Sequence, residues 1–221
     1  MILLAIDTAR ENCAVGLSID GVVIVRERMI GKGHAEVLMP EIAALMAEAD
    51  VKPTQIDRIA VSVGPGSFTG LRVGISAARG FGLVTGAPVI GISTLRAHAC
   101  AARIERDRLG RPAKPILALM RARDDEFYMQ AFNADAEPIE PPVVASLDSV
   151  VARVLEGGFD IAGAAIEHEG IAPPLHVRSA PDIRAVIALG LALDAAENPP
   201  RPLYVKPPDA QPQTRARIAR Q

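Results

Sequence analysis

A glycine-rich segment between a predicted strand and a predicted helix holds the residues whose spacing comes nearest to a chemical motif. It reads SVGPGSFTGLRVG, from Ser62 to Gly74. Free N–H groups at the start of a helix attract anions, so such a loop could hold a phosphate. Its glycines do not fit G-x-G-x-x-G, and no Lys-Ser or Lys-Thr pair completes a P-loop. A vestigial anion or nucleotide site at Asp7, Gly64, Gly66 and Ser67 is therefore kept as one hypothesis.

Ser67 is also compared with the serine of a nucleophile elbow. It lacks the glycines at both flanking positions of G-x-S-x-G. Its simpler role is the N-cap of the following helix, where its side chain would accept a hydrogen bond from an N–H group one turn on. We therefore predict no catalytic residue in this loop.

Small residues recur along the helix predicted from Ser67 to Val84. Gly70, Gly74 and Ala78 are spaced by four, with Ala77 alongside. A glycine inside a helix costs about 1 kcal/mol relative to alanine, which indicates that another backbone comes close. Two explanations stay open: close packing on the protein's own sheet, and a helix-to-helix interface with another chain.

The helix predicted from His34 to Ala49 carries two apolar stripes instead of one. They consist of Leu38, Ile42, Leu45 and Ala49, and of Met39, Ala43 and Met46. A helix with one face in water shows a single stripe, so two stripes indicate burial against the chain's own sheet and against something else. The two helices together give a predicted partner or dimer interface, formed by Leu38, Met39, Ile42, Ala43, Met46, Gly70, Val73, Gly74, Ala77 and Ala78.

Strand and helix patterns alternate along the chain and predict an α/β protein. Three strands come first, and Asp20-Gly21 is a strong hairpin turn between the second and third. Helix, strand, helix, strand and helix then follow up to residue 108. The second half repeats this theme more weakly, which suggests a duplication. We expect an N-terminal lobe with the interface helices at 1–110, a C-terminal α/β lobe at 111–206 and a flexible tail at 207–221.

The composition bounds the function. Lys and Arg number 24 and Asp and Glu 26, so the formal net charge is -2 and no overall field attracts nucleic acid. Any RNA contact would need a local patch or a partner. The basic tail with Arg215, Arg217 and Arg220 is expected to be solvated, with RNA contact as the sharper alternative.

Cys13 and Cys100 lack metal-ligand spacing and are interpreted as buried apolar residues. Without signal-peptide features or an apolar stretch of ~18 uncharged residues, we expect a cytoplasmic protein that does not contact membranes.

The chain resembles the bacterial TsaB (YeaZ) family over about residues 1 to 210. The central glycine motif is long and specific, whereas the second half matches only in patches. The matching segments are Leu4-Ala5-Ile6-Asp7-Thr8-Ala9, His34-Ala35-Glu36 with Leu38 and Pro40, Gly64 to Gly74, Gly91-Ile92-Ser93-Thr94-Leu95, Ala122-Arg123 with Glu126-Phe127-Tyr128, and Pro202-Leu203-Tyr204-Val205-Lys206.

This resemblance implies an actin/hexokinase/Hsp70-like (ribonuclease H-like) fold of two related α/β lobes. It also implies a non-catalytic role in making threonylcarbamoyladenosine at position 37 of ANN-decoding tRNAs. The implied partners are the TsaD-like catalytic subunit, a TsaE-like ATPase and, in isolation, a second copy of the chain, with tRNA reached indirectly through the complex. No stably bound cofactor is expected, and ATP or ADP only at the partner interface.

Three departures bear on whether the chain has chemistry of its own. The family usually has Asp-Ala-Arg before its Glu-x-Tyr element, but this chain has Arg121 in the acidic place. TsaD-like relatives bind a metal with H-x-x-x-H, and the matching stretch here keeps His98 but has Thr94 instead of the other His. Kinases of this fold carry a glycine-rich turn after the first Asp, which Asp7 lacks. A metallopeptidase (glycoprotease-like) and an ATP-dependent phosphotransferase are therefore the alternatives, and no metal site is predicted.

Overall fold

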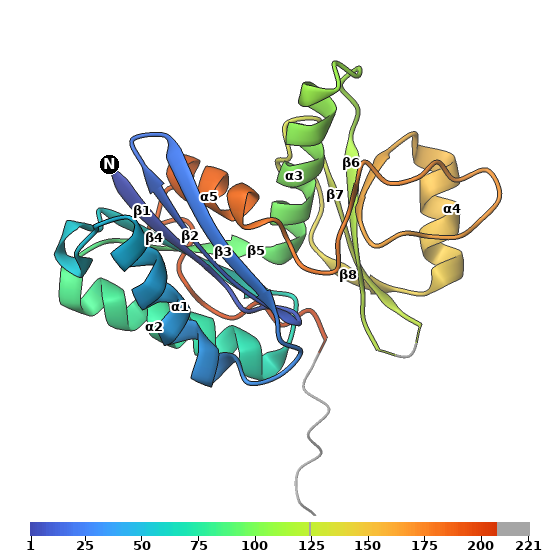
Figure 1. The fold of residues 1–221 in the computed structure, drawn as a ribbon. Coiled ribbons are helices and arrows are strands. Elements are labelled where there is room, and N and C mark those ends of the chain that lie inside the picture. The colour runs from blue at the N-terminus through green and yellow to red at the C-terminus, as the bar shows by residue number, and fades with distance from the viewer. Residues whose placement is uncertain (124, 207–221) are drawn as a thin grey trace, which may run out of the picture.

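The computed structural model describes residues 1–123 and 125–206 and shows two five-stranded sheets with helices on their faces (Figure 1). The predicted tail at 207–221 lies outside the described residues. In the first sheet the strand order is β3-β2-β1-β4-β5. β1 and β2 are antiparallel, as are β2 and β3, whereas β4 and β5 run parallel to β1. The strands are β1 (Ile2–Asp7), β2 (Asn12–Ile19), β3 (Val22–Met29), β4 (Arg58–Gly64) and β5 (Val89–Ser93).

The second sheet repeats this topology strand for strand. Its order is β10-β9-β6-β7-β8, with β6, β7 and β8 antiparallel in turn and β9 and β10 parallel to β6. Both lobes therefore have the ribonuclease H-like strand order, and the chain has the predicted two-lobe actin/hexokinase/Hsp70-like fold. The strands are β6 (Ile116–Arg121), β7 (Phe127–Phe132), β8 (Val143–Ala145), β9 (Asp160–Gly163) and β10 (His176–Val177).

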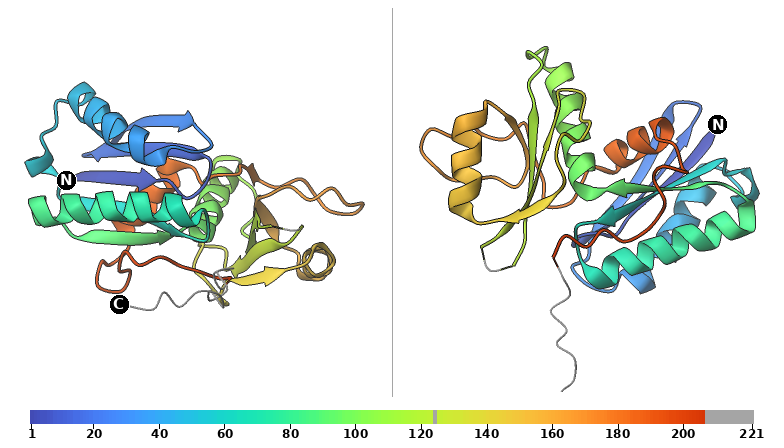
Figure 2. Two further views of the ribbon diagram at one scale, coloured as in Figure 1. Left: turned by 90° about the horizontal axis from the view of Figure 1, so that it is seen from below. Right: turned by 180° about the vertical axis from the view of Figure 1, so that it is seen from behind.

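The helices and sheets form five layers, because each central strand alternates its side chains between two apolar faces. Leu4 and Ile6 of β1 point to one core, and Leu3 and Ala5 to another. α1 and α2 cover the outer face of the first sheet, α5 and α3 lie between the sheets, and α4 covers the outer face of the second (Figures 1 and 2). The helices are α1 (His34–Glu48), η1 (Pro53–Gln55), α2 (Phe68–Thr85), α3 (Thr94–Arg108), α4 (Leu147–Gly157) and α5 (Ile183–Ala192).

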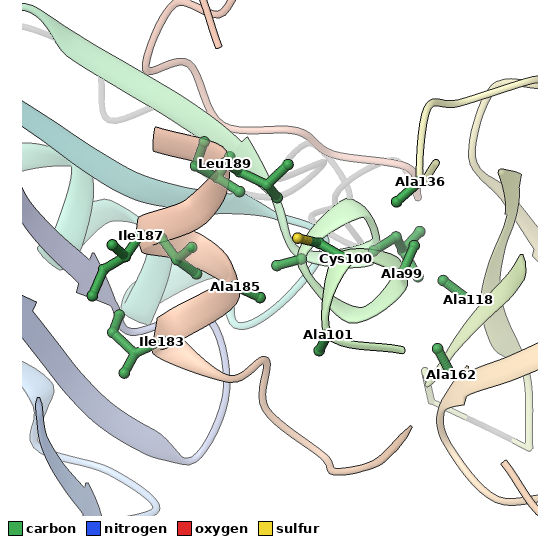
Figure 3. Packing of buried hydrophobic residues seen from close by; sticks show 14 of the residues in the cluster. Ala99, Cys100, Ala101, Ala118, Ala136, Ala162, Ile183, Ala185, Ile187 and Leu189 are labelled. Atoms are coloured by element: carbon green, nitrogen blue, oxygen red, sulfur yellow. The ribbon is translucent and has the colours of Figure 1, made fainter. Parts of the chain in front are cut away.

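The layer between the sheets is made largely of small side chains. Figure 3 shows Ala99, Cys100 and Ala101 of α3 between the residues of α5 and those of the second sheet. Small side chains let the helix lie close to its neighbours on both sides. Cys13 and Cys100 are both buried, free cysteines, as their spacing predicted.

The packing does not divide the chain at residue 110. α3, which precedes that position, packs mainly on β6 and β9 of the second sheet, whereas α5 packs on β1 and β4 of the first. The segment after α5 also returns to the first lobe, where the Leu203 N–H donates to the Val63 carbonyl at 2.7 Å. The chain therefore crosses between the lobes more than once.

Two short elements, η1 and the edge strand β8, were not predicted. Pro53 at the first position of η1 favours its helical start.

Candidate functional site

The glycine motif forms a strand-to-helix turn between β4 and α2. The Ser67 side chain accepts a hydrogen bond from the Gly70 N–H at 3.2 Å, so Ser67 is the N-cap of α2, as predicted. The Ser67 N–H donates to the Ala9 carbonyl at 2.7 Å, which ties the turn to the end of β1. This N–H group therefore does not face an anion.

The glycines of the motif let α2 cross very close to the end of β1. A Cβ atom at Gly70 would lie 2.1 Å from the Thr8 carbonyl oxygen, and one at Gly74 would lie 2.4 Å from Thr8 Oγ1. At Gly66 it would lie 2.3 Å from the Ala9 carbonyl oxygen. Thr8 Oγ1 also donates to the Gly70 carbonyl at 2.8 Å across this contact. Of the two explanations for the small residues, packing on the chain's own sheet accounts for Gly70 and Gly74.

Asp7 lies at the end of β1, is fully buried and does not line the open cleft between the lobes that is described below. Burial raises the pKa of its carboxyl to about 6, against the opposing effects of the nearby Ser62 hydroxyl and the Ala9 N–H group. The Ala9 N–H donates to Oδ1 at 3.2 Å, whereas Oδ2 has no partner of normal hydrogen-bond geometry among the described residues. Asp7 and the buried Gly64 therefore do not join Gly66 and Ser67 in an open anion site.

Replacing Asp7 with asparagine is expected to stabilise the protein above pH 6. An unfolded aspartate has a pKa near 3.9, so the native state binds more protons between about pH 4 and pH 6 and the free energy of unfolding falls as the pH rises through this window. At about 1.4 kcal/mol per pKa unit, the loss is roughly 3 kcal/mol, and Asp7→Asn removes it while keeping the Oδ1 acceptor. Urea unfolding of both proteins at pH 4 and pH 7.5 measures this; an equal difference at both values would contradict it.

An open cleft of about 860 Å³ lies between the lobes at the start of α2. Its walls come from the β1–β2 turn, the first turn of α2, the end of β6 and the C-terminal segment up to Lys206. Arg10 spans it, because its Nη1 donates to the Arg121 carbonyl at 3.2 Å. Arg121, which stands where the family usually has an aspartate, is exposed at the end of β6 and adds positive charge to this wall.

α1 and α2 lie side by side on the first sheet and present an outward face (Figure 2). Six of the ten predicted interface residues are buried inside the chain and so are not available to a partner: Leu38, Ile42, Met46, Gly70, Gly74 and Ala78. Met39, at 50% exposure, and Ala43 are on the surface, and Val73 and Ala77 are half-buried. The second stripe on α1 is thus only partly exposed, because Met46 packs into the core with Leu45.

Two exposed apolar residues at the end of α2 were not among the predicted interface residues. Leu83 is 87% exposed and Val84 is 78% exposed. The sequence could have indicated them, because both are large apolar residues that follow Ala78, the last buried residue of α2. Together with Met39, Ala43, Val73 and Ala77 they form what we call the α1–α2 face.

The histidines offer no evident metal site. His98 is fully buried on α3, where burial lowers its pKa to about 3, and its ring centroid lies 6.3 Å from that of His176. His34 is buried with Nε2 3.2 Å from the Asn12 carbonyl oxygen, which suits a packing role. Within residues 1–123 and 125–206, no three or more His, Cys, Asp and Glu side chains are grouped to hold a metal ion. No helix in the same ranges is long and apolar enough to cross a membrane.

Comparison with known proteins identifies relatives over most of the chain. The family model for TsaD, tRNA N6-adenosine threonylcarbamoyltransferase, matches residues 25–203. The tRNA threonylcarbamoyladenosine biosynthesis protein TsaB of Escherichia coli is 35% identical over 139 residues, which are 63% of this chain and 58% of that protein. An uncharacterized protein of Mycobacterium tuberculosis is 32% identical over 216 residues, covering 95% of this chain and 94% of that protein.

Solved structures give the same result. The crystal structure of an uncharacterized protein with similarity to peptidase YEAZ from Pseudomonas aeruginosa has a TM-score of 0.76 at 26% identity, covering 93% of this chain and 99% of that one. A structure of YeaZ from the same organism has a TM-score of 0.73, also at 26% identity, over 92% and 99% of the two chains. This chain, which also matches the TsaD family model over residues 25–203, therefore belongs to the TsaB/YeaZ family.

Proposed function

We propose that this chain is a non-catalytic subunit of the complex that forms N6-threonylcarbamoyladenosine at position 37 of ANN-decoding tRNAs. Membership of the TsaB/YeaZ family carries this proposal, through its relatives named as tRNA threonylcarbamoyladenosine biosynthesis proteins. In the proposal the chain binds and activates a TsaD-like catalytic subunit. A TsaE-like ATPase completes the assembly, and the chain alone forms a homodimer.

The α1–α2 face supports the partner-binding part of the proposal. An exposed apolar patch is typical of a protein interaction site. Leu83, Val84 and Met39 are large apolar side chains with at least half of their surface in water. A helical partner that covers them would remove this surface from water, which is the main favourable term in association. ATP or ADP is proposed to act only where such a partner meets the chain.

The local chemistry supports the non-catalytic part of the proposal. Asp7, the last residue of the first strand and the counterpart of the first Asp of kinases of this fold, is fully buried. His98 is buried and neutral at physiological pH, because burial lowers its pKa. Among the described residues, no three or more His, Cys, Asp and Glu side chains are grouped to hold the metal ion that a metallopeptidase would need.

A threonylcarbamoylation assay tests this function directly. The TsaD-like and TsaE-like proteins of the same organism are incubated with ANN-decoding tRNA, ATP and a threonylcarbamoyl donor, with or without this chain. We expect modified adenosine to form at least tenfold faster when the chain is present. The proposal fails if the rate is unchanged, and metal analysis and ATP turnover of the isolated chain test the two alternatives.

A further inference from the structure

The cleft between the lobes concentrates positive charge in a chain whose net charge is negative. The formal net charge of the whole chain is -2. In the part of the chain that the structure describes, the charged residues lining the cleft are Arg10, Arg72, Arg121, Arg123 and Lys206, against the single carboxylate of Glu11. Such a local field attracts a polyanion even though the overall charge does not.

Lys206 and Arg10 lie near carboxylates, whereas the guanidinium groups of Arg72 and Arg121 lie over the aromatic rings of Phe68 and Phe127. Lys206 Nζ lies 2.8 Å from Glu126 Oε2, and Arg10 Nε lies 3.5 Å from Glu11 Oε2. Arg72 and Arg121 are both exposed and stand on different walls, one on α2 and one at the end of β6. A phosphate chain that enters the cleft could therefore meet a guanidinium from each lobe.

Aromatic side chains stand beside these guanidinium groups. The rings of Phe68 and Tyr204 are 5.4 Å apart between centroids, and both residues line the cleft. They are 46% and 45% exposed, and the Arg72 guanidinium lies 3.7 Å from the Phe68 ring centroid. A basic groove with exposed aromatic rings is the arrangement that binds single-stranded nucleic acid, because bases stack on the rings while cations follow the backbone.

The carboxylates of the cleft argue against a nucleoside triphosphate with Mg²⁺. Mg²⁺ at such sites is usually held by one or two carboxylates together with the phosphates. Among residues 1–123 and 125–206, Glu11 is the only carboxylate in the lining; it is already paired with Arg10, while Asp7 is buried away from the cleft. The lining thus suits a polynucleotide strand, whose phosphodiesters contact the cations and whose nucleobases stack on the rings without a metal ion.

We propose that this cleft binds a short single-stranded segment of RNA directly. The identity of that RNA rests on the proposed function, which makes the anticodon loop of an ANN-decoding tRNA the natural probe. Direct binding differs from the expectation that tRNA reaches this chain only through the complex. The volume of the cleft suits a small ligand, so only a short piece of an RNA strand would enter it.

Fluorescence anisotropy with a labelled anticodon stem-loop tests the proposal on the full-length chain. Arg121→Glu is expected to weaken binding at least tenfold and to lower the salt dependence of the association constant by about one ion. Phe68→Ala is expected to weaken it at least fivefold, since stacking on one base is lost. The control Arg184→Glu makes the same charge change at a side chain that is 63% exposed at the start of α5, and should alter binding less than twofold.

Two comparison ligands, an RNA duplex and ATP with Mg²⁺, test whether the cleft prefers a single strand to a duplex or to a nucleotide. A blunt RNA duplex with the same number of phosphates should bind at least tenfold more weakly, and ATP with Mg²⁺ should not displace the stem-loop. Equal binding of the duplex, displacement by ATP, or an unchanged affinity of Arg121→Glu would each overturn the proposal. Every variant keeps the residues beyond Lys206, so these contribute equally in all of them.

The same samples separate this proposal from the proposed function. Arg121→Glu should still form a complex with the TsaD-like protein, because Arg121 is not part of the α1–α2 face. If that complex forms and activates threonylcarbamoylation while the isolated chain binds no RNA, only the RNA proposal fails. If RNA binds as described but no complex or activation is found, only the proposed function fails.

Discussion

Replacing Gly70 with alanine is expected to lower the free energy of unfolding by about 3 kcal/mol. In a helix this change normally stabilises, because alanine is favoured over glycine by about 1 kcal/mol. Here the new Cβ atom would lie 2.1 Å from the backbone oxygen of Thr8, so α2 must move away from β1. Overpacking, including the backbone shift it forces, typically costs about 1–3 kcal/mol and occasionally more, and a backbone oxygen this close places Gly70 at the upper end, above the helix-propensity gain.

Two other glycines of α2 provide matched comparisons. Gly80→Ala introduces a Cβ atom that meets nothing within 4 Å and should stabilise the protein by about 0.5–1 kcal/mol. Gly74→Ala should fall between the two, because the atom in its way is Thr8 Oγ1, which can rotate at the loss of its hydrogen bond to Gly70. Urea unfolding followed by circular dichroism gives the three values. Equal effects at Gly70 and Gly80 would show that α2 does not press on β1 as described.

The elements that local pattern defines were predictable from the sequence. The Asp20-Gly21 turn, the strands beside it, the helix Thr94–Arg108 and the N-cap Ser67 depend on residues within a turn or two of each other. Asp182, a residue type that favours the N-cap position, likewise accepts a hydrogen bond from the Arg184 N–H at the start of α5. Local propensity and hydrogen bonding carry such features, and they do not depend on which segments meet in space.

The features that depend on distant segments were not predictable in the same way. A helix pattern does not reveal that α3 packs on the sheet that follows it while α5 returns to the first. The small residues of α2 are compatible with an interface to another chain and with packing inside this one. Only the structure, in which Gly70 and Gly74 lie against Thr8, distinguishes the two. The positive cleft unites Arg10, Arg72 and Arg121 from three separate parts of the chain, and no spacing in the sequence connects them.

The location of the glycines also changes how the partner interface must be tested. Gly74→Leu would block a close helix approach from outside, but its side chain would first collide with Thr8 inside the chain. A lost complex would then report damage to the fold. A test of the α1–α2 face needs an exposed residue whose replacement suits a helix, and Ala43 on α1 meets both conditions.

Ala43→Arg is expected to weaken the complex with the TsaD-like subunit at least thirtyfold, equivalent to about 2 kcal/mol. Arginine has nearly the helix propensity of alanine, so α1 should remain intact. A cation placed within an apolar interface loses water without gaining a partner, and substitutions at the centre of interfaces commonly cost 2 kcal/mol or more. Isothermal titration calorimetry measures the affinity, and the threonylcarbamoylation rate should fall with it.

Ala152→Arg supplies the control, because Ala152 is an exposed residue of α4 on the far side of the second lobe. It makes the same change in charge and size on a helix surface outside the α1–α2 face. We expect its affinity and rate to stay within twofold of the unmodified chain, with both variants unfolding at the same urea concentration as that chain. If Ala43→Arg binds as tightly as Ala152→Arg, the partner does not use the α1–α2 face. The exposed side chains of Met39, Leu83 and Val84 would then need another explanation.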